Sequence, residues 1–314
     1  MKELAKDNRL YSLDALRGFD MFWIIGAEEI FHKMAEIKSN NFWHGLSNQF
    51  IHPQWNGFVF YDVIFPLFLF LAGIATPFSI GKQLAKGKNR TDLLKRVIKR
   101  GIILVLLGII YNNGLEIKSI EEIRFGSVLG RIGLAYMFAN IIYLYANQRN
   151  QILWFFSLLI GYWGLIIFFS APGFLAGDLS IEGNIVSYLD RMIMPGKLFL
   201  GIHDPEGLFS TIPAISTALL GIYTGNILIN TAVNKRKQTT FKLITISFLL
   251  IIAAQIWNLF FPINKNLWTS SFVLQCGGIS MLLMAVFYYL IDVLEYNKWA
   301  FIFKIIGMNS ILIY

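Results

Sequence analysis

Two titratable residues near the start of the second apolar segment have types suited to proton transfer. His52 comes directly before Pro53, which favours extended backbone over helix at the histidine. Its imidazole titrates near neutral pH and can take a proton from an amine or a hydroxyl, so we expect His52 to act as general base. Asp62 is the only charged residue in the segment that follows, and the spacing leaves open whether it contacts His52. An exposed loop histidine is the alternative.

The first apolar segment, SLDALRGFDMFWIIGAEEIF, carries ionisable residues that a spanning helix rarely tolerates. A charge at the bilayer centre costs about 2.5–3.5 kcal/mol, so such residues must face the bundle interior or an aqueous cavity. Asp14 and Arg17 share a helix face and can pair. Arg131 is a second arginine within an apolar run. Both arginines could neutralise buried acids or hold phosphates, and their spacing does not decide between these roles.

Further polar residues lie where later apolar segments begin or end. Asp204 and Glu206 precede the sixth segment, where they could cap a helix N-terminus or act as paired carboxylates that orient a sugar or an amine. Residues 264–266, Asn-Lys-Asn, form a polar cluster before the eighth segment, and Asn309 lies in the last apolar run.

These side chains must be positioned by a helix bundle in a membrane. Of the 314 residues 56% are hydrophobic and 15% charged, with a mean hydropathy of +0.57, which excludes a disordered chain, a collagen-like fibre or a small disulfide scaffold. We expect an all-α, polytopic transmembrane bundle that forms a single domain over residues 1–314. About nine spans of about 20 residues each are expected, the last cut short by a chain truncated at its C-terminus. The eight complete candidates are 11–31, 57–81, 97–113, 126–146, 151–171, 207–230, 240–261 and 268–292, and the ninth begins near Trp299.

The net charge of +8 reads as a topology signal rather than as a nucleic-acid surface. A cytoplasmic N-terminus puts the basic loop 82–100 and most other lysines and arginines on the inner side. The histidines then fall at or beyond the outer face, which predicts a site that faces the periplasm: His32, His44, His52 and His203. The single Cys276 excludes an internal disulfide. The sequence contains no phosphate-binding glycine loop and no HExxH motif, and no metal site is expected.

Seven segments, taken together and in order, carry a family resemblance. The sequence resembles the transmembrane heparan-alpha-glucosaminide N-acetyltransferase family, including its bacterial relatives, over nearly the whole chain. The segments are RLYSLDALRGFDMF, WNGFVFYDVIFPLFLFLAG, VLGRIGLAY, YLDRM, HDPEGLFSTIPAI, FPINKNLWTSSFV and GMNSILIY. The resemblance implies an acetyltransferase that passes an acetyl group from cytosolic acetyl-CoA, its co-substrate, to the amine of a glucosamine beyond the membrane.

The resemblance also implies roles for individual residues. The histidine before the WNG motif, here His52, is the family's proposed active-site residue. The family's asparagine, eleven residues after the arginine of the first-span motif, is Glu28 here, and its glutamine before the fourth-span arginine is Gly130. An acid at position 28 could orient His52 or hold a substrate ammonium, but it donates to an acetyl carbonyl only when protonated. The predicted catalytic residues are His52, Glu28 and Asp62. The residues predicted to bind the donor are Arg17, Arg131 and Asp14. The residues predicted to bind the acceptor are Asn56, Asp204, Glu206, Asn266 and Asn309.

Several alternatives stay open at this stage. His52 could act as base in direct transfer, which we favour, or could itself carry the acetyl group. A permease for an amino sugar or saccharide would also need polar groups inside the bundle, and an acyltransferase of a cell-envelope glycan would tolerate Glu28. The expected partners are an amino-sugar acceptor, membrane lipid and a second copy in a homodimer. The expected location is a bacterial inner membrane.

Overall fold

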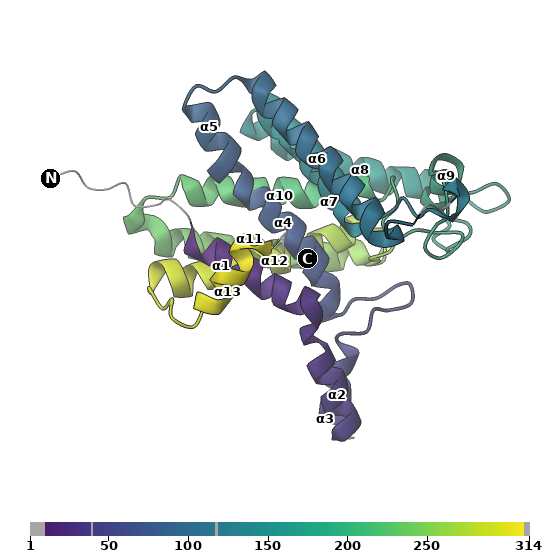
Figure 1. Cartoon of the computed structure of the whole chain (residues 1–314), viewed down its shortest axis with the longest axis horizontal. Coiled ribbons are helices and arrows are strands. Elements are labelled where there is room, and N and C mark those ends of the chain that lie inside the picture. Colours follow the sequence, from purple (N-terminus) through teal and green to yellow (C-terminus); the bar gives the residue numbers. More distant parts are fainter. Residues whose placement is uncertain (1–9, 39, 117–118, 311–314) are drawn as a thin grey trace.

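The computed structural model describes residues 10–38, 40–116 and 119–310. In this part of the chain helices are joined by irregular loops, and the β-structure is limited to two isolated bridges. The α-helices are α1 Tyr11–Phe22, α2 Glu29–Ile37, α3 Asn41–Asn48, α4 Ile64–Thr76, α5 Lys82–Ala85, α6 Arg90–Asn113, α7 Val128–Tyr145, α8 Gln148–Phe168, α9 Ile185–Ile193, α10 Thr211–Ile229, α11 Arg236–Asn258, α12 Ser270–Tyr288 and α13 Phe301–Met308. Figure 1 shows a bundle of long helices with α2 and α3 projecting on one side and α9 at one end.

Six helices in the described residues are long and apolar enough to cross a membrane: 60–85, 128–145, 148–168, 211–229, 233–258 and 270–293. The all-α membrane bundle is therefore supported, whereas the nine predicted spans are not confirmed. The first expected span is broken at Gly26, whose φ of 109° separates α1 from α2. The third lies within α6, which begins earlier and carries Arg96, Lys99 and Arg100 in its first half. Of the ninth predicted span, the structure describes α13 and the residues up to 310. The predicted truncation concerns the C-terminal end, which lies outside the described residues.

The central helix is α10, which is buried over most of its length and packs against α4 (Figure 1). Glycines permit this contact, because a Cβ on Gly221 would lie 2.0 Å from the carbonyl oxygen of Phe70 and one on Gly73 would lie 2.2 Å from that of Ala218. Small residues let backbones approach closely between membrane helices. The pair α1 and α13 meets in the same way, since a Cβ on Gly18 would overlap the backbone of Phe303. These close contacts hold α4 and α1 against their neighbouring helices.

The loops gather at two ends. At the first, which we call the outer end, the indole of Trp55 donates to the carbonyl of Leu179 (2.8 Å), and the backbone N–H of Gly57 donates to the carbonyl of Ile263 (3.1 Å). At the other, the inner end, Arg236 donates to the carbonyl of Asp292 (3.0 Å). The basic segment 82–100 was predicted as a loop, but the structure divides it into α5, a short connection over residues 86–89 and the first part of α6. It lies at this inner end, next to the segments around residues 145 and 230. The names outer and inner follow the sidedness predicted from the sequence, which stays a prediction.

Candidate active site

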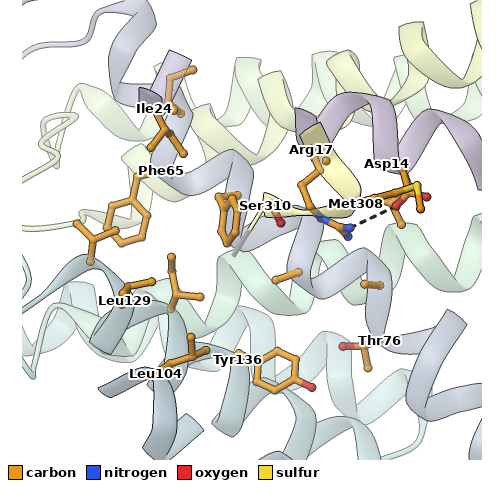
Figure 2. Close-up of a pocket in the computed structure, with 18 of the residues that line it drawn as sticks. Asp14, Arg17, Ile24, Phe65, Thr76, Leu104, Leu129, Tyr136, Met308 and Ser310 are labelled. Carbon is orange, nitrogen blue, oxygen red and sulfur yellow. Dashed lines mark hydrogen bonds and ion pairs between the residues drawn. The ribbon is translucent and has the colours of Figure 1, made fainter. Parts of the chain in front are cut away.

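One cavity of about 990 Å³ connects residues of the outer end with residues of the inner end. His52, Glu206 and Lys265 line it on the outer side, and Arg17 and Arg100 line it on the inner side. A face of the α4 segment runs along it from Tyr61 to Lys82. From residue 64 to residue 82 a helix rises roughly 27 Å, close to the ~30 Å hydrocarbon core of a bilayer. The cavity therefore extends over about the thickness of a membrane. Figure 2 shows its middle and inner parts.

His52 and Asp62 form a hydrogen-bonded pair at the outer end. His52 Nδ1 lies 2.7 Å from Asp62 Oδ1, and the carboxylate is fully buried while 40% of the imidazole surface is exposed. The expected helix from residue 57 does not begin until residue 60, so that residues 53–59 run in irregular backbone. Asp62 Oδ2 accepts the backbone N–H of Val59 (3.0 Å) and fixes this late start. The late helix start therefore produces the contact that the spacing left open.

Lys265 completes the polar group around His52. Its Nζ lies 2.6 Å from His52 Nε2 and 3.8 Å from Asp62 Oδ1. Burial lowers the pKa of Lys265, and the Asp62 carboxylate offsets part of that shift. In the sequence Lys265 is visible only as part of a polar cluster, because 213 residues separate it from His52. The signal that could have found it is a lysine between two asparagines immediately after an apolar run.

Glu28 reaches His52 only through Tyr61. The Tyr61 hydroxyl donates to Glu28 Oε1 (3.1 Å), and the Tyr61 ring stacks on the imidazole with centroids 5.0 Å apart and planes inclined by 19°. Tyr61 was not among the predicted site residues, although this tyrosine directly precedes Asp62 in the sequence. The structure therefore places Glu28 behind the tyrosine, where it can orient the ring that covers one face of His52.

The two acids expected at the start of the sixth span both bind Arg124. Arg124 donates from Nε and Nη2 to the two carboxylate oxygens of Asp204 (2.8 and 2.7 Å), and from Nη2 to Glu206 Oε2 (2.5 Å). Helix α10 begins later, at Thr211, so neither acid caps it. Burial acts to raise the pKa of Asp204, but Arg124 outweighs it and holds that pKa below its usual range. Glu206 lines the cavity, whereas Asp204 is enclosed beneath it.

Arg131 is held among loop carbonyls and outside the cavity lining. Its Nη2 donates to the carbonyl of Pro205 and to the hydroxyl of Ser210, and its guanidinium lies 4.8 Å from the centre of the Trp268 ring. Only 2% of the residue is exposed. Both arginines were predicted to bind the donor. The structure does not bring them together, because Arg17 lies at the inner end and Arg131 does not line the cavity.

The inner part of the cavity is basic. Arg17 Nη1 donates to Asp14 Oδ1 at 3.3 Å, and Figure 2 shows this pair beside Met308 and Ser310. Arg100 lies across the cavity with its guanidinium 5.0 Å from the centre of the Tyr136 ring. Lys82 adds a third cation to the lining. Among the described lining residues, these three cations stand against the single carboxylate of Asp14 at this end, which makes it suited to an anion.

The asparagines expected to bind the acceptor occupy different places. Asn56 accepts from Asn264 Nδ2 (3.0 Å), and Asn266 Nδ2 lies 3.4 Å from the carbonyl of Gln54. Both bonds join the His52 loop to the loop before α12 at the outer end. Asn309 lines the cavity, but it follows α13, whose Gly307 packs on Asp14. The structure therefore brings Asn56 and Asn266 near His52 and separates Asn309 from them.

The outer arrangement can carry out acyl transfer to an amine. A buried carboxylate that accepts from Nδ1 holds the imidazole in the tautomer whose Nε2 carries a lone pair. Such a nitrogen can remove a proton from an attacking amine or can itself attack a thioester. The inner cations supply what phosphate groups require. The cavity thus has a hydrogen-bonded histidine–aspartate pair at its outer end and an excess of cations at its inner end.

Comparisons with known proteins show to which family the chain is similar. A family model described as heparan-alpha-glucosaminide N-acetyltransferase, catalytic, matches residues 9–262. The Homo sapiens protein named heparan-alpha-glucosaminide N-acetyltransferase is 26% identical over 360 residues, covering 98% of this chain and 52% of that protein. The Mus musculus protein of the same name is 24% identical over 361 residues, covering 98% and 53%. The chain spans about half the length of these curated relatives.

Proposed function

The chain belongs to the heparan-alpha-glucosaminide N-acetyltransferase family, and we propose that it is an integral-membrane enzyme that moves an acetyl group from acetyl-CoA to the amine of a glucosamine-type sugar. The donor enters the cavity at the inner end and the acceptor arrives at the outer end. One observation carries the proposal: the same cavity is lined by His52 at one end and by Arg17, Lys82 and Arg100 at the other.

The inner end supports binding of the donor. Phosphate groups favour arginine and lysine, and the inner lining holds three such cations. Between the two ends the lining is mainly apolar, with Phe65 and Leu129 labelled in Figure 2. This combination suits a molecule with an anionic head and a long, weakly polar arm that ends in a thioester. The arm then presents its acetyl group near His52.

His52 supports the chemical step. An amine attacks a thioester carbonyl only when it is unprotonated, so a base must take its proton. His52 Nε2 acts as this base in direct transfer, while Asp62 orients the ring and stabilises the imidazolium that forms. Glu206, in the cavity lining near Lys265, supplies negative charge that draws the sugar's ammonium to the outer end. Asp204, Asn56 and Asn266 support the outer loops behind it.

Acetyl transfer from labelled acetyl-CoA to glucosamine by the purified chain tests this proposal. Wild-type protein is expected to form N-acetylglucosamine, and His52→Ala is expected to lose at least about 100-fold of that rate. His44→Ala is the matched control, because His44 is an exposed histidine of α3 on the same side. Transfer that His52→Ala leaves unchanged would remove His52 from the mechanism.

A permease for an amino sugar is the second candidate, since the cavity touches residues of both ends. Glucosamine accumulation in sealed vesicles that lack acetyl-CoA would favour it. A rise in the melting temperature on addition of CoA would favour the enzyme, because a ligand that binds only the folded state stabilises that state. An envelope-glycan acceptor, a homodimer and a bacterial inner membrane stay predictions.

A further inference from the structure

We propose that Lys265 is a further catalytic residue, which donates a hydrogen bond to the acetyl oxygen while negative charge develops on it. The inference rests on the proposed acetyl transfer at His52. It assigns a chemical role to a residue that lies in the loop before α12, far along the chain from the histidine.

The position of the ammonium carries the argument. Lys265 Nζ is 2.6 Å from His52 Nε2, the atom that must meet the amine, and 3.2 Å from His52 Nδ1, but 3.8 Å from Asp62 Oδ1. A lysine that served only to neutralise the carboxylate would lie within hydrogen-bond distance of it. Lys265 also lines the cavity, and 21% of its side chain is exposed. Its charge is thus directed at the place of reaction.

The loop that carries Lys265 is fixed on both sides of the lysine. Asn264 donates from its side chain to Asn56 Oδ1 (3.0 Å), and its own Oδ1 accepts the backbone N–H of Leu267 (2.8 Å). The carbonyl of Ile263 accepts the N–H of Gly57 (3.1 Å), which joins this loop to the one that carries His52. A donor held in advance where charge will develop stabilises the transition state without reorganising.

The chemistry of the step leaves the lysine unchanged. The amine nitrogen forms a bond to the acetyl carbon, the carbon–sulfur bond breaks, and its electron pair leaves with the CoA sulfur. The proton of the amine passes to His52 Nε2 and then to the thiolate, so that the products are the amide and the CoA thiol. When the amine occupies Nε2, the Lys265 ammonium turns on its flexible stem to the carbonyl oxygen and keeps its protons throughout.

The neighbouring side chains cannot supply this donor equally well. Glu206 is a carboxylate bound to Arg124, and the Tyr61 hydroxyl donates to Glu28. Among the described residues that line the cavity, Lys265 is the cation that contacts His52. The outer end therefore contains a base, an orienting acid and one charged donor, which together provide what acyl transfer to an amine requires.

Steady-state kinetics of Lys265→Ala and Lys265→Met test the proposal. The kcat of both variants is expected to fall about 100- to 1000-fold, the effect of removing one such donor, while the KM values for acetyl-CoA and glucosamine stay within about threefold. Ethylammonium added to Lys265→Ala is expected to restore part of the rate, because it can occupy the vacated space. Lys265→Met preserves the packing of the stem, and thermal unfolding confirms that both variants fold.

Lys33→Ala is the matched control, since Lys33 is an exposed lysine of α2 that pairs with Glu36 and its loss should leave kcat unchanged. An unaltered kcat in both Lys265 variants, a loss confined to KM, or a failure of ethylammonium to raise the rate would overturn the donor role. Covalent acetyl recovered on the Lys265 amine would also overturn it. An inactive wild-type chain would instead refute the acetyl transfer on which the proposal rests.

Discussion

The two ends of the cavity are built in opposite ways. At the outer end the polar groups are matched closely, with His52 2.7 Å from Asp62 and Arg124 bound to two carboxylates. At the inner end Arg17 and Asp14 form a longer contact of 3.3 Å, and three cations line the cavity there: Arg17, Lys82 and Arg100. The outer end thus has short, directed bonds, whereas the inner end has an excess of positive charge.

This difference indicates that the outer end orients reacting groups, whereas the inner end attracts an anion. Proton transfer needs groups held in fixed geometry, because the rate depends on distances of about 3 Å between reacting atoms. Binding of a polyanion needs mainly charge, since cationic side chains on flexible stems can adapt to it. Substitutions at the outer end should therefore reduce kcat or stability, and substitutions at the inner end should raise KM.

The largest effect is expected from Asp62→Asn. The variant keeps the volume of the side chain but removes the charge that fixes the His52 tautomer and stabilises the imidazolium, so kcat should fall about 1000-fold, in the middle of the range for acid–base groups. Steady-state acetyl transfer measures this change. The half-buried Asp178, which accepts the backbone N–H of Ser180 (2.6 Å) in another outer loop, provides the control, Asp178→Asn. A kcat of Asp62→Asn within threefold of wild type would place the reaction elsewhere.

Arg131→Met should destabilise the outer end by about 3 kcal/mol, because it leaves buried acceptors without a partner. The affected groups are the carbonyl of Pro205 and the hydroxyl of Ser210. Thermal unfolding in detergent measures the loss, with Lys197→Met as a control at an exposed site. If Arg131→Met were as stable as the control, these bonds would not hold the loop.

His203 should make the outer end sensitive to acid. Burial lowers its pKa from 6.5 to about 4, and Ser187 Oγ lies 2.7 Å from its Nδ1. The unfolded chain takes up the proton at a higher pH than the folded chain, so folding stability falls as pH drops from 6.5 toward 4. Between pH 7.5 and pH 5 this amounts to about 2 kcal/mol.

His203→Asn should therefore become more stable relative to wild type as the pH is lowered, which unfolding at the two pH values would show. Asp190 acts in the opposite direction in both proteins, because burial raises its pKa to about 6 and its protonation favours folding. The difference in folding stability between His203→Asn and wild type therefore reports on His203 alone. A relative stability independent of pH would contradict a buried, neutral histidine.

The smallest effect is expected at the inner end. Arg100→Gln removes one of three lining cations, so the KM for acetyl-CoA should rise about tenfold, or about 1.4 kcal/mol, with kcat nearly unchanged. The rise should shrink at high salt, which screens the remaining charges. Arg149→Gln, at an exposed residue in the first turn of α8, should leave KM unchanged. A fall in kcat alone would abolish the distinction between the two ends.

The membrane bundle and the site residues His52 and Asp62 could be predicted from the sequence. Long apolar runs, and titratable residues in or beside them, are visible within a short stretch of sequence. It could not predict their contact, which depends on a helix that begins at residue 60 rather than 57. Lys265 was missed because loop-to-loop hydrogen bonds over a long separation bring it to His52. Arg131 was expected at a phosphate site because charge and burial are visible in sequence but the direction of a side chain is not.

Sidedness in sealed vesicles tests the central claim most directly. Chains reconstituted in one orientation receive labelled acetyl-CoA on the side of residues 82–100 and glucosamine on the other side, and both compounds are too polar to cross the bilayer unaided. The account predicts that N-acetylglucosamine forms only on the glucosamine side, and only when the donor is on the inner side. Product that requires both substrates on the same side would contradict a cavity that connects the two ends.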